Sequence, residues 1–574
     1  MKQETTRHSL SHIMAFAVQK LYPDVKFGIG PAIENGFYYD FGLKNPITLE
    51  DLPIIEREMR ELIGQDIKFV KKCVSKSEAE KIFASQPYKI ELVNELEGNI
   101  TIYETILPSG AVGFIDLCAG PHVESTKEIP TDAFKLLKLA GAYWRGSEKN
   151  QMLTRIYGLA FETKKELEDY LKLQEETEKR DHRKLGPQLD LFMFHETAPG
   201  MAYWLPKGII LLNQLLDFWR KEHIKYGYKE IRSPLLNKKE LYITSGHWDH
   251  YREEMFLCET EESEIYGLKP MNCPNAMIVF GSKSRSYREL PLRLSDCDIL
   301  HRYERSGTLN GLLRVREFTQ DDAHIFISED QIKEEYEKIF EIAEKFYSIF
   351  NLEYSFRFGT RPEKFMGDVS TWDKAEKELK EILKGSKKPF VVLEGDGAFY
   401  GPKIDILMKD SLGREWQLGT IQLDFQIPKN FKLTFIDKDG KEKTPVVIHR
   451  VIYGSLERFI GILTEHFGGA FPLWISPIQA CVIPISETHN KYAEQVVKTL
   501  VEADIRCELS NDNDTVSKRI RNGEMQKIPY LLVVGDKEVK AKSVAVRSRG
   551  KKEIEVLKLT KFLERIKMEV TEKK

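Results

Sequence analysis

The chain has 574 residues, of which 41% are hydrophobic and 30% charged, and its formal net charge is −3. This length exceeds what one hydrophobic core serves, so three or four domains of roughly 100 to 200 residues are expected. No apolar stretch approaches the roughly 20 residues that cross a bilayer, and no basic-then-apolar secretory pattern opens the chain. We therefore expect a cytoplasmic protein with no membrane partner.

Charge and cysteine content constrain the partners further. A net charge of −3 argues against nucleic acid unless basic residues cluster, and lysine and arginine outnumber acids after Lys537. The seven cysteines form no Cys-x-x-Cys pair, and their number is odd, so we expect reduced thiols available for metal binding or catalysis.

The first third of the chain contains two kinds of pattern. Residues 1–157 mix short strand-like and helical segments. Residues 161–185 are rich in glutamate and lysine and carry apolar residues at helical spacing, which predicts a helical connector that Gly186 and Pro187 end.

A long amphipathic helix is predicted from Gly208 to Gly227, because apolar residues recur there at three- and four-residue intervals. A short strand and Pro234 follow it. Further short strand candidates with large loops continue to Trp474, which indicates a sheet of mainly antiparallel pairs.

After Pro477 the pattern changes to alternating strands and helices, with apolar runs at residues 480–485, 530–534 and 544–546. This alternation is typical of a small α/β domain. We expect the following division: a first domain at 1–157, a helical linker at 158–186, a central domain at 187–475 and a last domain at 476–574.

The densest group of functional residue types lies between His301 and His324. Two strand-like arms carry Arg302 and Arg314 and meet at a glycine-containing loop. Such arginines can clamp a polyphosphate by bidentate contacts. A surface hairpin with solvated charges is the alternative for Arg-x-Glu alone, but the length and density of this stretch favour phosphate binding.

This stretch resembles the second motif of the class II aminoacyl-tRNA synthetases. Residues 454–458 resemble the third motif, and the Gly208 helix with Pro234 resembles the first, dimer-forming motif. The resemblance implies an α+β multidomain fold, with an N-terminal α+β editing domain, a class II antiparallel-sheet catalytic domain and a C-terminal α/β anticodon-binding domain. It assigns ATP contacts to Arg302, Glu304, Arg314, Phe318, Gln417, Ser455 and Arg458, of which Arg302 and Arg458 are the catalytic arginines.

Arginine suits this chemistry. Attack of an amino-acid carboxylate on the α-phosphate brings an anion toward a polyanion, and guanidinium groups with the Mg²⁺ of ATP stabilise the charge that develops. No general base is needed, because the nucleophile is already ionised. The oxygens must be held in line.

A possible metal site is formed by Cys273, His324 and His449, which are ligand types that bind zinc. Their separation is too large for spacing alone to predict a site, and for each histidine taken singly an ordinary core or surface position is the favoured alternative. The threonyl-tRNA synthetases carry these three residues in the same local contexts. The resemblance therefore implies one Zn²⁺ per subunit, with an open position that the amino and hydroxyl groups of threonine fill.

Valine lacks the hydroxyl. A site built to bind a polar group can favour the correct substrate over an analogue without that group by a factor of ~10⁴ to 10⁵. Serine lacks only a methyl group, which is worth ~1 to 3 kcal/mol. Serine is therefore expected to be activated too often, so a second, hydrolytic site is a physical requirement.

Residues near the N-terminus fit that requirement. His8 and His12 share one helix face, while Cys118 and His122 lie in Asp-Leu-Cys-Ala-Gly-Pro-His. By chemistry alone, these four could form a tetrahedral zinc site. The resemblance instead implies an editing pocket for the 3′ end of seryl-tRNA and a hydrolytic water, and it assigns to that pocket His8, His12, Asp116, Cys118, His122 and Lys89.

The remaining matches concern the amino acid and the anticodon. Asp322 fits the threonine ammonium group or a role in orienting a histidine, and Glu538 without the resemblance is a solvated surface charge. Threonine contacts are assigned to Gln320, Asp322, Tyr400, Lys403 and Gln422. Anticodon contacts are assigned to Asn513, Glu538 and Arg547.

The resemblance implies an enzyme, a threonine–tRNA ligase, that activates L-threonine with ATP, loads tRNA(Thr), hydrolyses seryl-tRNA(Thr) and forms a homodimer. Many family members begin with a ubiquitin-like domain, whereas this chain starts almost directly at His8, so we expect the form without that domain. Two alternatives remain: a catalytically silent RNA-binding relative, and a synthetase for proline or serine.

Overall fold

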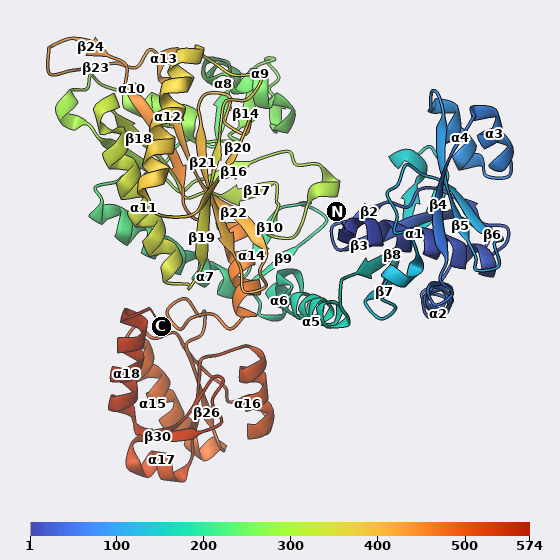
Figure 1. The fold of residues 1–574 in the computed structure, drawn as a ribbon. Helices are drawn as coiled ribbons and strands as arrows, with labels where there is room; N and C mark the ends of the chain where they lie inside the picture. The colour runs from blue at the N-terminus through green and yellow to red at the C-terminus, as the bar shows by residue number, and fades with distance from the viewer. Residues whose placement is uncertain (1, 574) are drawn as a thin grey trace. The chain divides into compact units, whose positions relative to one another are not determined.

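A computed structural model describes residues 2–573 of the chain (Figure 1). The chain divides after Glu176 into two compact units. Within the described part of the chain, no helix combines the length and apolar character that a bilayer-spanning segment requires. All seven cysteines are free thiols, as expected.

The first unit contains two antiparallel sheets and a long N-terminal helix, α1, whose Ile13, Met14 and Ala17 are fully buried in the core. The strand orders are β1-β3-β8-β7, with β2 on β3, and β4-β5-β6. The helices are α1 (Lys2–Leu21), α2 (Leu52–Ile63), α3 (Lys76–Ile82) and α4 (Pro87–Glu95), and α5 (Lys164–Arg180) begins in this unit and ends in the second. The strands are β1 (Lys26–Phe27), β2 (Ala32–Ile33), β3 (Gly36–Gly42), β4 (Lys68–Val74), β5 (Ile100–Ile106), β6 (Val112–Leu117), β7 (Phe134–Tyr143) and β8 (Met152–Ala160).

The expected end of the connector helix is wrong. Helix α5 ends at Arg180, and Asp181 caps a new helix, α6 (His182–Gln188), by accepting a hydrogen bond from the backbone N–H of Arg183 at 2.8 Å. Gly186 and Pro187 lie inside α6. The aspartate cap starts the second helix before the glycine and proline are reached.

The central part of the second unit is built on an eight-stranded sheet in the order β11-β15-β18-β25-β22-β21-β19-β20. Only the two outermost pairs are parallel, which confirms the expected antiparallel sheet. Helices α11 and α12 lie beside one another along it (Figure 1). The predicted Gly208 helix is α7, and it buries Leu211, Leu215 and Trp219.

The helices of this part are α6, α7 (Pro206–Lys225), α8 (Lys239–Ser245), α9 (His247–Tyr251), α10 (Cys273–Gly281), α11 (Ile332–Ser348), α12 (Val369–Gly385), α13 (Ile427–Asn430) and α14 (Leu456–Phe467). Its strands are β9 (Phe192–Phe194), β10 (Ala202–Trp204), β11 (Lys229–Glu230), β12 (Leu236–Lys238), β13 (Leu257–Glu259), β14 (Ile265–Leu268), β15 (Leu292–Asp296), β16 (Ile299–His301), β17 (Glu317–Thr319), β18 (Asp322–Ile327), β19 (Glu353–Gly359), β20 (Phe390–Leu393), β21 (Lys403–Lys409), β22 (Glu415–Asp424), β23 (Phe435–Ile436), β24 (Glu442–Lys443) and β25 (Val446–Val451).

The register of this sheet aligns four polar residues across four strands. His324 on β18 is opposite His449 on β25, His449 is opposite Gln422 on β22, and Gln422 is opposite Lys403 on β21. Because directly paired residues point to the same face, this row of four side chains shares one surface of the sheet.

The C-terminal part has the expected α/β pattern, with a five-stranded sheet in the order β27-β26-β28-β29-β30. Its core includes Val482, Leu532 and Val546 from the three predicted apolar runs. The helices are α15 (Asn490–Val501), α16 (Val516–Met525), α17 (Asp536–Ala541) and α18 (Leu559–Thr571). The strands are β26 (Ala480–Pro484), β27 (Cys507–Leu509), β28 (Tyr530–Val534), β29 (Ser543–Ser548) and β30 (Ile554–Lys558).

Candidate active site and a second histidine–cysteine site

One cavity of about 340 Å³ lies on the polar row of the eight-stranded sheet. Every residue that the sequence assigned to ATP, threonine or zinc lines it: Cys273, Arg302, Glu304, Arg314, Phe318, Gln320, Asp322, His324, Tyr400, Lys403, Gln417, Gln422, His449, Ser455 and Arg458. Tyr251, Met271, Thr420 and Arg450 also line it and were not predicted.

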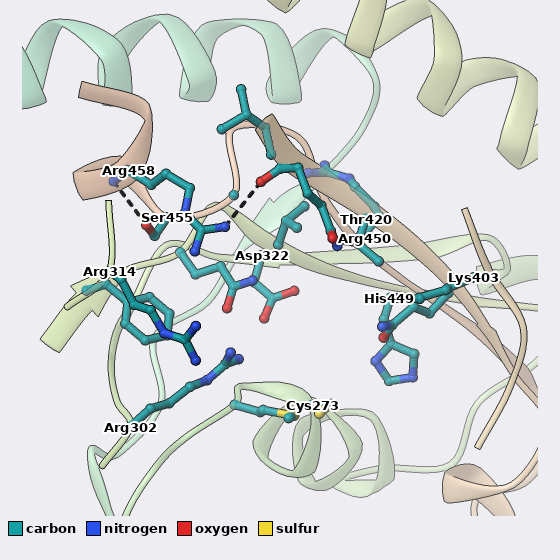
Figure 2. Close-up of a pocket in the computed structure, with 18 of the residues that line it drawn as sticks. Cys273, Arg302, Arg314, Asp322, Lys403, Thr420, His449, Arg450, Ser455 and Arg458 are labelled. Carbon is teal, nitrogen blue, oxygen red and sulfur yellow. Dashed lines mark hydrogen bonds between the residues drawn. The ribbon is translucent and has the colours of Figure 1, made fainter. Parts of the chain in front are cut away.

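Three arginines from three chain segments gather at one end of the cavity, as Figure 2 shows for Arg302, Arg314 and Arg458. Arg458 lies in the first turn of α14, where its Nε donates to the carbonyl of Leu313 at 2.9 Å. Burial lowers the pKa of Arg458, and the positive charges of Arg302 and Arg314 lower it further. Concentrated positive charge of this kind favours a bound polyanion.

Glu304 is the acidic partner of this cluster. Its Oε2 accepts hydrogen bonds from Nε and Nη2 of Arg314 at 2.9 and 2.7 Å. The guanidinium of Arg302 lies 5.1 Å from the ring centre of Phe318, a side chain that is largely buried. Two residues expected to contact ATP are therefore paired with each other, and Phe318 faces an arginine.

Gln417 and Lys403 are also held by hydrogen bonds around a buried carboxylate. The side-chain amide of Gln417 donates to Oδ1 of Asp405 at 2.9 Å, and its carbonyl accepts from Arg357 at 2.6 Å. Nζ of Lys403 lies 3.1 Å from Oδ2 of Asp405. This network fixes the direction in which both predicted substrate contacts point.

The metal-type residues converge at the other end. Cys273 begins α10, His324 lies in β18 and His449 in β25, and one ligand atom of each lies within 4.8 Å of the others. All three side chains are buried. Burial lowers the pKa of both histidines, which keeps the imidazoles neutral as metal ligation requires.

Two buried aspartates lie behind the histidines. Nε2 of His449 donates to Oδ2 of Asp424 at 2.9 Å, and among residues 2–573 its Nδ1 has no hydrogen-bond partner. Nδ1 of His324 lies 3.5 Å from Oδ1 of Asp296, a fully buried carboxylate. A thiol and two imidazoles with carboxylates behind them fit zinc, because such partners fix which ring nitrogen faces the metal.

Sequence reasoning missed these aspartates and His247. Asp424 is two residues beyond Gln422 in β22, so strand alternation already placed it on the same face. Nε2 of the fully buried His247 lies 3.7 Å from Sγ of Cys273. Nothing in the local sequence distinguishes Asp296 or His247 from ordinary buried polar groups.

The second site lies in the first unit, where α1 meets the loop after β6. Sγ of Cys118 lies 3.3 Å from Nε2 of His8 and 3.3 Å from Nε2 of His122. The Ser9 hydroxyl donates to a backbone carbonyl of α1, so Nδ1–H of His122 donates to the Ser9 oxygen at 3.1 Å. Nδ1 of His8 is 3.2 Å from the carbonyl of Pro121. Both Nε2 lone pairs therefore face the thiol.

A buried ion pair supports this site. Lys89 of α4 pairs with Oδ1 of Asp116, whose Oδ2 accepts from the Tyr39 hydroxyl at 2.7 Å and lies 3.4 Å from Nε2 of His12. Burial raises the pKa of Cys118 to about 11 and lowers the pKa of His12. The six residues assigned to editing thus form one cluster of neutral imidazoles, a neutral thiol and an ion pair. His8, His12, Cys118 and His122 also lie close enough to share a metal ion.

The three residues assigned to the anticodon lie on separate elements of the C-terminal part. Asn513 is in the exposed loop before α16. Oε2 of Glu538 accepts from the backbone N–H of Gly535 at 3.0 Å and so caps α17. Arg547 of β29 lies 3.9 Å from Glu524.

Comparison with known proteins agrees with this geometry. Three family models match: "tRNA synthetase class II core domain (G, H, P, S and T)" over residues 256–467, "Anticodon binding domain" over 479–569 and "Threonyl and Alanyl tRNA synthetase second additional domain" over 101–157. The chain is therefore a class II aminoacyl-tRNA synthetase of the expected α+β multidomain type.

Individual relatives identify the family within the class II synthetases to which the chain belongs. The chain is 51% identical to the threonine–tRNA ligase of Caldanaerobacter subterraneus over 99% of this chain and 87% of that one. It is also 51% identical to that of Thermotoga maritima over 100% and 89%. The chain belongs to the threonine–tRNA ligase family.

Solved structures give the same assignment. A structure described as the RNA binding domain of threonyl-tRNA synthetase from Cryptosporidium parvum matches with a TM-score of 0.66 at 41% identity, covering 68% of this chain and 98% of that chain. A putative threonyl-tRNA synthetase from Aeropyrum pernix matches with a TM-score of 0.60 at 29% identity, covering 68% and 96%.

Proposed function

We propose that this chain joins L-threonine to ATP as threonyl-adenylate and then transfers threonine to tRNA(Thr). One observation carries the proposal: three arginines and a Cys–His–His trio occupy opposite ends of one cavity. The arginine end fits a triphosphate, and the trio fits the amino acid.

The arginines account for the first chemical step. Arg302 and Arg458 neutralise the phosphate oxygens on which negative charge develops, together with the Mg²⁺ carried by ATP. Arg314 donates to Glu304 through Nε and Nη2, which leaves its Nη1 to join them at the phosphates. The threonine carboxylate needs no base, because it is already ionised, so the cavity would only have to hold it in line with the α-phosphate.

Cys273, His324 and His449 would hold a zinc ion. When bound, zinc would supply a Lewis acid with one open position that distinguishes a β-hydroxy amino acid from valine. Asp322 is 8% exposed and is held by Asn272 at 3.3 Å, so its carboxylate is available to the threonine ammonium group. Tyr400 and Gln422, which hydrogen-bond to each other, line the same end.

The first unit would hydrolyse seryl-tRNA(Thr). The imidazoles of His8 and His122 keep unprotonated Nε2 atoms beside Cys118, so they can accept hydrogen bonds from a water. Burial raises the pKa of Cys118, which argues against a thiolate nucleophile. Asp116 would orient His12, whose Nε2 lies 3.4 Å from its Oδ2, and Lys89 balances the charge of that carboxylate.

A homodimer and anticodon contacts complete the proposal. Large apolar side chains are exposed on the hairpin β9–β10 and on α7, the helix of the first motif. They are Met193, Phe194, Tyr203, Ile209 and Ile224. Apolar side chains left exposed on a helix and on the hairpin directly before it in the chain are the kind of surface that a subunit interface covers. Asn513, Glu538 and Arg547 offer polar groups for single-stranded anticodon bases.

Amino-acid-dependent ATP–pyrophosphate exchange tests the proposal. Threonine should support exchange, serine should support it weakly, and valine and proline should not. No exchange with any amino acid would favour the silent RNA-binding alternative. Exchange that depends on proline, or on serine above threonine, would favour the other synthetases.

A further inference from the structure

A fully buried histidine at the start of α6 connects helix α14 to the loop before Arg314. It is not one of the residues that line the cavity. His182 is 1% exposed, and its Nδ1 lies 2.6 Å from Oε1 of Glu465 on α14. Its Nε2 accepts a hydrogen bond from the backbone N–H of Leu312 at 3.0 Å. Because Nε2 must accept, the ring hydrogen is on Nδ1 and is donated to Glu465.

This arrangement excludes a metal role for the same residues. Asp181, His182 and Glu465 lie close enough together to surround a cation. Both ring nitrogens of His182 are already used, one by Glu465 and one by Leu312, so no imidazole lone pair is available. The cluster is a hydrogen-bonded connection between segments.

Glu465 is itself held in place. Its Oε1 also accepts from the backbone N–H of His182 at 3.1 Å, and its Oε2 pairs with Arg414. Burial would raise the pKa of Glu465, but the hydrogen bonds from His182 and Arg414 lower it. The carboxylate is therefore an ionised acceptor with a fixed direction.

The loop between Arg302 and Arg314 packs closely against this imidazole. Leu312 is fully buried, and the carbonyl of Leu313 accepts from Nε of Arg458 at 2.9 Å. Gly311 has a φ of +50°, and a Cβ there would lie 2.2 Å from Nε2 of His182. Glycine is thus required for the loop to approach the imidazole.

The two contacts on the loop come from one helix. Arg458 and Glu465 are seven residues apart on α14, which is about two turns and places them on the same side. Arg458 holds Leu313 directly, and Glu465 holds Leu312 through His182. Arg314 is the next residue of the chain.

We propose that His182 is a positioning residue for ATP: it joins helix α14 to residues 311–313, so that Arg314 and Arg458 face the same phosphate chain. The inference rests on the proposed function, since it concerns the same cavity. It adds a residue that lies outside that cavity.

The test compares His182→Leu with His182→Gln in threonine-dependent ATP–pyrophosphate exchange. Leucine removes both hydrogen bonds and should raise the KM for ATP by about tenfold, while the KM for threonine stays at the parental value. The glutamine amide supplies one acceptor and one donor, so it should restore most of the loss. Amide hydrogen exchange over residues 309–314 should be faster in the leucine variant and near parental in the glutamine variant.

His489→Leu is the matched control. His489 is also buried, contacts a backbone N–H of Ser486 and the carboxylate of Asp536, and lies in the C-terminal part. This variant should lose stability without a change in the KM for ATP. If His182→Leu is insoluble, Gly311→Ala must raise the same KM, because its methyl group displaces the loop from the imidazole.

The inference is overturned if His182→Leu keeps the parental KM for ATP, or if His182→Gln is no better than leucine. It is also overturned if the control raises the KM equally. Absence of threonine-dependent exchange in the parent would instead refute the proposed function. In that case hydrogen exchange over residues 309–314 still decides whether His182 holds the loop.

Discussion

Replacing Asp424 by asparagine should weaken zinc binding by reversing one hydrogen bond. Oδ1 of this fully buried carboxylate accepts from the backbone N–H groups of Gln426 and Ile427 at 2.7 and 3.0 Å, and an asparagine oxygen can retain both contacts. The asparagine NH₂ then faces Nε2 of His449, which is a donor in the parent.

Two donors cannot face each other in a buried site, so the ring hydrogen of His449 must move to Nδ1 or the contact must break. Nδ1 is the nitrogen left for the metal, and protonation there prevents ligation. Loss of such an orienting carboxylate typically costs ~10- to 100-fold in metal affinity, which is about 1.4 to 2.7 kcal/mol.

Zinc affinity should be measured by competition with a chromogenic chelator, which reports metal binding without reference to activity. Asp410→Asn is the control, because Asp410 is also buried but contacts Arg414 and Trp416, away from the trio. Parental zinc affinity in Asp424→Asn would refute the assignment of Nδ1 as the ligand atom.

The remaining predictions concern both sites. Cys273→Ser should abolish zinc retention and threonine-dependent exchange together, and normal exchange without bound metal would contradict the assignment. His8→Ala should spare threonine loading but let seryl-tRNA accumulate; clearance at the parental rate would show that the site lies elsewhere. Lys89→Met should destabilise the chain by ~3–5 kcal/mol in denaturant unfolding, because Asp116, only 3% exposed, loses its counterion, and adding Asp116→Asn should recover part of that loss. Hydrolysis of seryl-tRNA should stay constant as pH falls from about 7.5 to about 6.5, because burial lowers the pKa of the histidines and keeps them neutral; a fall to half near pH 6.5, as an unperturbed imidazole gives, would contradict this.

Local patterns in the sequence predicted much of the fold. The three- and four-residue spacing around Leu211, Leu215 and Trp219 predicted α7, and short apolar runs predicted β26 and β28. The predicted end of the connector helix was wrong, because Asp181 caps a new helix that begins a few residues before the glycine and the proline.

Some residues of the site were likewise predicted from the sequence, and others were missed. Motif residues such as Arg302 and Cys273 were predicted because the family resemblance names them. His182, Asp296 and Asp424 were missed, because their roles depend on partners that only long-range strand and helix packing supplies. Asp296, for example, contacts a histidine 28 positions along the chain through the pairing of β15 with β18.

The row from His324 to Lys403 restricts how this cavity can change in evolution. Neighbouring strands are about 4.8 Å apart, so three steps separate its ends by roughly 14 Å whatever the lengths of the connecting loops. Insertions between the strands are tolerable, but a single residue added within β25, which pairs with β18 and β22 without a bulge, would turn His449 to the opposite surface. Length variation among related enzymes should therefore fall outside these four strands.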